Sequence, residues 1–142
     1  MTKRLIERRK LANGLCLEFW DESRKLAGDR WFVGIRAVVP VTVPRDPPQG
    51  IPPEVIQLVL KEVGEQICFQ LKEERYFISE GEVNSVREQL KEVFLKNVLS
   101  YLSHPVFPNR FLTRKLQDVA DKMHGGPDYL QKVLDQLRGP GS

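Results

Sequence analysis

NGLCLEFWDESRKLAGDRWFVGIRAVVPVTV, residues 13–43, is the stretch that decides the fold. Both of its ends alternate apolar and polar residues, which is the pattern of half-buried β-strands, and a charged run separates them. Asn13-Gly14 favours a hairpin turn, because both residue types tolerate the positive φ of a type I′ turn. Extended to the residues before Asn13, the alternation predicts strands at about 4–12, 15–21 and 30–43.

Helical periodicity follows a proline-rich connector at residues 43–53. It predicts helices at about 53–63, 82–102, 108–123 and 127–137. Residues 66–78 are ambiguous between a strand and a continued helix, and we predict a strand because Ile67, Phe69 and Leu71 alternate with polar residues. Ser79 and Glu82 have the spacing of a capping box, which predicts that the helix beginning at 82 is capped by both side chains.

The order of the elements, strands first and helices mostly after, predicts an α+β fold in which helices pack on an antiparallel sheet of three or four strands. The length of 142 residues fits one globular domain, which we place at residues 1–138, followed by a flexible tail at 139–142. The Tyr76-Phe77 pair is predicted to pack in the core, as large aromatic residues usually do.

Several classes of function are disfavoured by composition. A net charge of +3 does not favour a nucleic-acid partner, and the basic excess at residues 3–10 is typical of an edge strand. The two histidines, His104 and His124, do not pair with a cysteine at ligand spacing, and no phosphate-binding glycine loop is present, so we predict neither a metal nor a cofactor.

The compartment is predicted to be the cytoplasm. No run approaches the roughly 18 apolar residues of a membrane span, and the basic N-terminus lacks the apolar run of a secretory signal. Cys16 and Cys68 lie in apolar alternating runs, which indicates small buried side chains rather than a disulfide. We therefore predict no membrane partner.

The candidate binding site is the charged run between the two tryptophans. Its residues are Trp20, Asp21, Ser23, Arg24, Asp29, Arg30 and Trp31. Arginine side chains are suited to phosphate or carboxylate, so a loop of this composition could bind a small anion. The alternative is an ordinary hairpin loop in which Asp21 and Ser23 turn the chain, Gly28 takes a positive φ, and Asp29 pairs with Arg30.

A family pattern coincides with this run. Arg4, Arg8 and Arg9, followed by Asp21-x-Ser23 and Gly28, resemble the PilZ pattern of an arginine arm and an Asp-x-Ser-x-x-Gly strand motif. The resemblance implies cyclic di-GMP binding, with the arginines on the phosphates and a guanine edge and the second motif lining the ligand. Gly28 stands two places too far from Ser23, and the arm is too close to the motif, so membership is not favoured.

A second resemblance covers more of the chain. Residues 13–31, with the run FPNRFL at 107–112, resemble a small family of uncharacterised bacterial proteins. This resemblance implies a bacterial source and carries over no catalytic residue.

From these observations we predict a small non-enzymatic binding or interaction module. Its expected partners are another protein or a second copy, which would contact it through a strand edge or a C-terminal helix, with a small anionic ligand as a further option. Two alternatives remain open: cyclic dinucleotide binding, and a small enzyme with an acid or base at Asp21 or Asp29.

Overall fold

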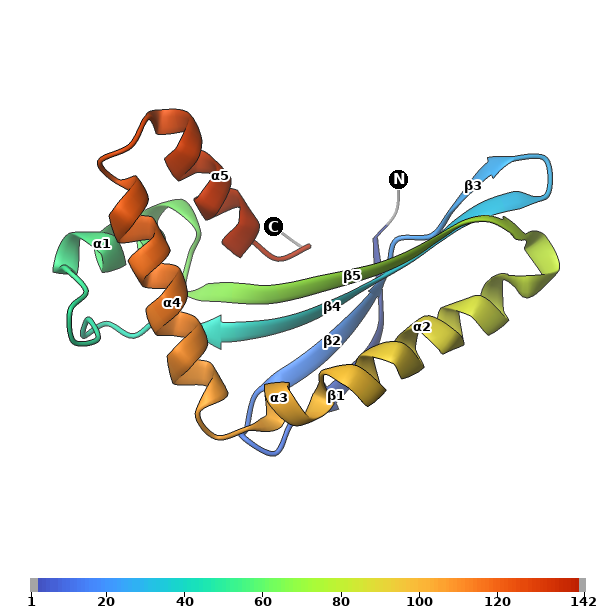
Figure 1. Ribbon diagram of the computed structural model, residues 1–142, viewed down its shortest axis with the longest axis horizontal. Coiled ribbons are helices and arrows are strands. Elements are labelled where there is room, and N and C mark those ends of the chain that lie inside the picture. The colour runs from blue at the N-terminus through green and yellow to red at the C-terminus, as the bar shows by residue number, and fades with distance from the viewer. Residues whose placement is uncertain (1–2, 141–142) are drawn as a thin grey trace. The chain divides into compact units, whose positions relative to one another are not determined.

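The protein has an α+β fold, described for residues 3–140 in a computed structural model (Figure 1). The strands are β1 (Arg4–Lys10), β2 (Cys16–Asp21), β3 (Arg24–Ala27), β4 (Arg30–Thr42) and β5 (Gln66–Ser79). The helices are α1 (Pro53–Glu62), α2 (Val83–Asn97), α3 (Leu99–Ser103), α4 (Phe107–Lys122) and α5 (Pro127–Leu137), with a 3-10 helix, η1 (Glu80–Glu82), before α2. The predicted class and the antiparallel sheet are confirmed, and residues 66–78 belong to a strand.

The chain divides into two compact units. Unit 1 comprises Met1–Val39 and Gln70–His104, and unit 2 comprises Pro40–Phe69 and Pro105–Ser142. The single domain at 1–138 stays a prediction, and residues 141–142 of the expected tail lie outside the described residues. Within residues 3–140, every helix is too short or too polar to cross a membrane.

The β1–β2 hairpin is confirmed, but its predicted turn type is wrong. Gly14 has a φ of 90°, whereas Asn13 is not among the residues with positive φ, so a type I′ turn is not formed. Instead the amide of Gly14 donates to the carbonyl of Leu11 at 3.0 Å, and the amide of Leu11 donates to the carbonyl of Leu15 at 2.8 Å. This wider turn leaves the Asn13 side chain free to bond elsewhere.

The expected loop at residues 21–30 is also corrected, because it is mostly strand. Asp21 pairs with Ile35 in the β2–β4 ladder, and Arg24 pairs with Phe32 in the β3–β4 ladder, so the register continues without a gained or lost residue. The amide of Glu22 bridges the two ladders by donating to the carbonyl of Gly34 at 2.9 Å. Strands β2 and β3 are therefore one arm of a long hairpin, and β4 is the other arm.

Strand β5 pairs with β4. Since β2 and β3 occupy the same edge of β4 in one register, β5 lies on the opposite edge. Among the described residues β4 is its only strand partner, so the outer side of β5 is an edge of the sheet. Strand β1, which pairs only with β2 in the same part of the chain, forms the other edge.

Helix α2 covers one face of the sheet in unit 1. Side chains of alternate residues on β2 and β4 point to it, and the Phe19 and Phe94 rings lie 5.9 Å apart between their centroids. The fully buried residues of this layer include Leu17, Val33, Ile35, Ala37 and Leu90. The opposite face, which we call the open face, carries the even-numbered residues of β2 and β4.

Two predictions about the following helix are wrong. Ser79 makes no side-chain cap hydrogen bond, because residues 80–82 form η1 and move the start of α2 to Val83. The helix also does not run unbroken to residue 102, because Val98 departs from helical geometry with a φ of −124°. The break turns α3 so that Leu102 is fully buried, while Tyr101 remains 52% exposed.

Unit 2 has an apolar core of its own between three helices and the strand segments. Helix α4 contacts both α1 and α5. The ring of Phe69 packs edge-on against Phe107 and Phe111, with centroids 5.5 and 5.8 Å away. Arg138 ties the end of α5 to α1 by donating to the Glu62 carbonyl at 2.7 Å.

An ion pair joins strand β1 to α2. Lys91 Nζ lies 2.7 Å from Glu7 Oε1, and Lys91 also reaches the Glu88 carboxylate at 3.3 Å. The hydrogen bond from Lys91 lowers the pKa of Glu7 below its ordinary 4.5, and the same bond raises the pKa of Lys91 above 10.5. Folding therefore favours the charged form of both groups.

We expect Asn13→Ala to lower the free energy of unfolding of unit 1 by about 1–3 kcal/mol. The Asn13 Nδ2 donates to the Leu102 carbonyl at 2.7 Å and the His104 carbonyl at 3.0 Å, and its Oδ1 accepts from the Leu15 amide at 3.1 Å. Denaturant unfolding followed by tryptophan fluorescence measures it, because both tryptophans lie in unit 1. The control Asn97→Ala, at an exposed asparagine, should change stability by less than about 0.5 kcal/mol. Equal effects would contradict this role of Asn13.

We expect Glu7→Gln to cost about 1 kcal/mol or less of stability at neutral pH, because the pair is partly exposed. A lowered pKa means that the Glu7 contribution is present above pH 4.5 and is lost as the pH falls through the folded-state pKa. The stability difference between wild type and variant should therefore close in acid. A difference that persists at low pH would show that Glu7 acts through packing rather than charge. Glu92→Gln, an exposed carboxylate of α2, is the control.

Candidate functional site

The predicted site residues are distributed over both faces of the hairpin. Trp20 pairs with Arg36, which places it on the open face, and its Nε1 donates to Glu18 Oε1 at 2.9 Å. Trp31 lies on the α2 side, where its Nε1 donates to Glu80 Oε1 of η1 at 3.3 Å. The two tryptophans therefore do not border a common site.

Asp21 is buried and faces α2. Its Oδ1 accepts from the Ser23 amide at 2.9 Å, and its Oδ2 accepts from Arg4 Nη2 at 3.3 Å. Arg87 Nε of α2 lies 3.1 Å from the same Oδ2 without the alignment of a hydrogen bond, so this contact is an ion pair. Asp21 thus pairs with two arginines and holds the backbone between β2 and β3, which is a structural role.

The remaining predicted residues surround the hairpin tip. Ser23 Oγ accepts from the Gly34 amide at 3.2 Å. Arg24 lies over the Phe32 ring, 5.1 Å from its centroid. Arg30 pairs with Asp29 at 3.7 Å beside Gly28, which has a φ of 57°. The predicted positive φ of Gly28 and the Asp29–Arg30 pair are confirmed. The prediction that Asp21 and Ser23 turn the chain is wrong, because β2 and β3 continue in one register through these residues.

The residues of the PilZ-like pattern are engaged in the same way. Arg8 pairs with Glu18 at 3.4 Å, and Arg9 pairs with Glu7 at 3.1 Å. Neither contact brings an arginine to Ser23, whose hydroxyl already accepts a backbone hydrogen bond. This arrangement lends no support to a cyclic dinucleotide site.

A buried charge cluster on the open face was not anticipated from the sequence. Arg36 grips Glu22 with two hydrogen bonds, of 2.7 Å from Nε and 3.2 Å from Nη2, and its Nη1 donates to Gln70 Oε1 at 3.1 Å. Lys3 reaches Glu22 at 3.7 Å. The Glu22 carboxylate is paired with both Arg36 and Lys3, so we regard the cluster as structural. The sequence indicates this cluster through Arg36, a single charged residue within an apolar strand.

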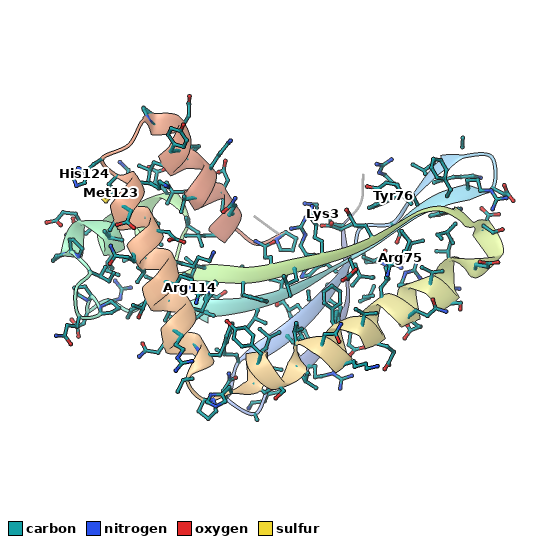
Figure 2. All side chains as sticks on the ribbon, in the orientation of Figure 1. Lys3, Arg75, Tyr76, Arg114, Met123 and His124 are labelled. Carbon is teal, nitrogen blue, oxygen red and sulfur yellow. The ribbon has the colours of Figure 1, made fainter. Side chains whose placement is uncertain are left out.

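The candidate site that emerges is the outer edge of β5 between Leu71 and Phe77. Leu71, Tyr76 and Phe77 are 37%, 57% and 72% exposed, so the prediction that Tyr76 and Phe77 pack in the core is wrong. Figure 2 shows Tyr76 on the side of β5 away from α2 and Arg75 on the side of α2. We call this segment, LKEERYF at residues 71–77, the β5 edge segment.

Phe77 is strained as well as exposed. Its φ of 57° makes it the only residue other than glycine with a positive φ in the described part of the chain. The carbonyl of odd-numbered Glu65 bonds to Val43 and the amide of even-numbered Glu80 bonds to Asp29, so the alternation shifts by one residue between them. We place this β-bulge at Phe77 because of its positive φ. A bulky residue in this conformation lowers the free energy of unfolding by about 1–3 kcal/mol. Selection for stability alone would not favour phenylalanine at this position.

The Tyr76 ring packs on Phe32, which in turn lies beside Gly34. The centroids of the two rings lie 5.1 Å apart, and Phe32 lies flat over Gly34. A Cβ added at Gly34 would approach two atoms of the Phe32 ring to 2.8 Å. Glycine at position 34 therefore allows Phe32 to lie on the sheet and to carry Tyr76 at the surface.

Metal and redox chemistry receive no positive signal. No cluster of three His, Cys, Asp or Glu side chains within residues 3–140 is placed to hold a metal ion. Cys16 is a free thiol, and Cys68 is buried.

We expect Gly34→Ala to lower the free energy of unfolding by about 1–3 kcal/mol, because the new methyl group displaces the Phe32 ring. In a Phe32→Leu background the additional cost of Gly34→Ala should be smaller, since leucine lacks the two ring atoms that clash. Fluorescence-detected unfolding of the four proteins measures this coupling. Gly81→Ala is a matched control, because its Cβ would have nothing within 4 Å. Strict additivity of the two substitutions would rule out the proposed stacking.

Comparison of the chain with protein-family models, curated proteins and solved structures finds no match. The resemblance carried by residues 13–31 and 107–112 therefore stays a prediction.

Proposed function

We propose that this protein is a non-enzymatic binding module that engages an extended segment of a protein partner along the β5 edge segment. The observation that carries the proposal is Phe77, a large aromatic residue that is both strained, with a φ of 57°, and 72% exposed. Strained residues cluster at functional positions, and exposed apolar groups mark interaction surfaces.

The backbone of the edge supports strand addition. The amide of Val43 donates to the carbonyl of Glu65, so regular alternation directs the backbone groups of Lys72, Glu74 and Tyr76 away from β4. In agreement with this, the Glu74 carbonyl accepts a hydrogen bond from the Arg75 side chain at 2.8 Å. An added strand would satisfy these outward groups by main-chain hydrogen bonds, with side-chain contacts supplying the specificity.

The engaged state of the polar residues elsewhere supports a binding role over catalysis. The carboxylates of Asp21 and Glu22 are each held by arginine. An acid or base at Asp21 would have to leave these partners before it could act on a substrate. The β5 edge segment, by contrast, offers its apolar side chains and backbone groups to solvent.

We also propose the cytoplasm as the compartment. The support is the free thiol of Cys16, since reducing compartments keep cysteines in this state.

Site-specific photo-crosslinking tests the binding role. Replacement of Phe77 by the photo-reactive p-benzoylphenylalanine in the native host should yield an adduct with another polypeptide on irradiation. The same replacement of Tyr129, a 64% exposed aromatic residue of unit 2, should not. Mass spectrometry of the adducts identifies what was bound and where.

The edge-blocked variant Glu74→Pro sharpens this test. Proline removes an outward amide and no hydrogen bond to β4, so the fold should survive, which tryptophan fluorescence checks. The Phe77 adduct should disappear in this variant. Equal adducts at positions 77 and 129, or an adduct that persists in Glu74→Pro, would contradict the proposed role of the edge.

A further inference from the structure

We infer that the strand which occupies the β5 edge segment is the same segment of a second copy of this chain, in antiparallel orientation about a two-fold axis through Glu74. This inference rests on the binding role proposed above and names its partner. The segment LKEERYF is complementary to itself when it is reversed about its central residue.

The reversal pairs opposite charges and apolar ends. With the axis at Glu74, Glu73 of each copy faces Arg75 of the other, and Leu71 faces Phe77. Lys72 faces Tyr76, where an ammonium group beside an aromatic ring is favourable. Leu71, Tyr76 and Phe77, the exposed large hydrophobic residues of β5, would thus be covered together.

The backbone agrees with this register. Residues 72, 74 and 76 direct their amides and carbonyls outward, as argued above, so the self-pair at Glu74 and the pair between Lys72 and Tyr76 are hydrogen-bonded. The pair between Glu73 and Arg75 is then of the non-hydrogen-bonded kind, in which opposing Cα atoms are about 4.5 Å apart and side chains approach more closely. Glu73 and Arg75 are therefore opposed at the kind of position where the distance between the two strands is shortest.

Neighbouring registers fit less well. An axis at Glu73 would place Leu71 against Arg75 and would draw Phe69 opposite Phe77. Phe69 is engaged in unit 2 by the rings of Phe107 and Phe111. An axis between two residues would oppose an outward backbone group with an inward one, which an antiparallel ladder does not allow.

In the single chain, the Arg75 side chain occupies part of the β5 edge. Arg75 pairs with Glu73 of its own strand at 3.4 Å and caps the Glu74 carbonyl at 2.8 Å. This exposed intrachain ion pair stabilises little. On association Arg75 exchanges Glu73 of its own strand for Glu73 of the second copy, and an amide replaces the guanidinium on the Glu74 carbonyl.

Charge exchange tested by sedimentation velocity distinguishes this pairing from any other dimer. The wild type should associate reversibly over about 1–300 µM, a range that covers weak edge-to-edge interfaces. Glu73→Arg alone and Arg75→Glu alone should each weaken association about tenfold or more, because attraction becomes repulsion at two symmetric pairs. Lys96→Glu, which reverses an exposed charge on α2, should leave association unchanged.

A mixture of the Glu73→Arg and Arg75→Glu variants provides the decisive experiment. Their chains carry only arginine and only glutamate, respectively, at positions 73 and 75, so a heterodimer should form where neither variant dimerises alone. This rescue cannot come from an intrachain pair. Glu74→Gln should strengthen association of the otherwise unchanged chain, because it removes two like charges that face each other on the axis.

The outcomes separate the two proposals. A wild type that stays monomeric, with a Phe77 adduct to a different polypeptide, would overturn self-pairing and leave the binding role of the edge intact. A dimer unaffected by Glu73→Arg and Arg75→Glu would place the interface elsewhere and overturn the inference. Absence of both the dimer and the adduct would remove the two proposals together.

Discussion

The continuous register between the β2–β3 arm and β4 is the constraint on which the rest of unit 1 depends. Because Asp21 faces Ile35 and Arg24 faces Phe32 in one register, the odd-numbered side chains of β2 and β4 reach the α2 side and the even-numbered ones reach the open face, up to the irregularity between Lys25 and Ala27 at the hairpin tip. A slip of one residue would send Phe19 away from Phe94 and expose Asp21. The apolar core, the buried acids and the placement of the tryptophans all follow from this single register.

Sequence patterns predict most of the fold, because apolar periodicity reports burial directly. The alternation around Phe19 and Ile35 and the helical stripe through Leu90 and Phe94 are both read correctly for this reason. The strand at 24–27 was missed, because a hairpin that extends beyond the core keeps its geometry but loses its apolar face. Gly28-Asp29 indicates a two-residue turn, but the irregularity between Lys25 and Ala27 shifts the register by one residue, so the turn alone does not predict that Glu22 lies close to Arg36.

The candidate site was harder to predict, and the reason is physical. Residue type indicates what usually becomes buried, so Tyr76 and Phe77 were read as core. Phe77 is exposed at a β-bulge, and Tyr76 lies on the face away from α2. The pattern of apolar residues in the sequence predicts neither feature. Conversely, the charged residues around Asp21 are predicted to bind a ligand because they are polar. In the structure Asp21 and Glu22 form ion pairs with arginines instead.

The two edges of the sheet are treated differently. Strand β1 is short, bears a run of basic residues and has a register irregularity between Leu5 and Glu7, all of which discourage pairing with another strand. Strand β5 is longer and ends in exposed aromatic residues. Its charged residues, Lys72, Glu73, Glu74 and Arg75, are of both signs and can pair with those of a second copy, whereas the charged residues of β1 are mostly basic. This asymmetry explains why association is expected at one edge and not at both.

The side chain of Asn13 has a consequence for the order of events during synthesis. Its partners, the carbonyls of Leu102 and His104, lie 89 and 91 residues further along the chain. The N-terminal hairpins emerge from the ribosome long before α2 and α3 exist, and residues 40–69 belong to the other unit. At ordinary translation rates the interval between Val43 and His104 is roughly 3–12 s. During this interval the apolar side of the N-terminal hairpins is not yet covered by α2.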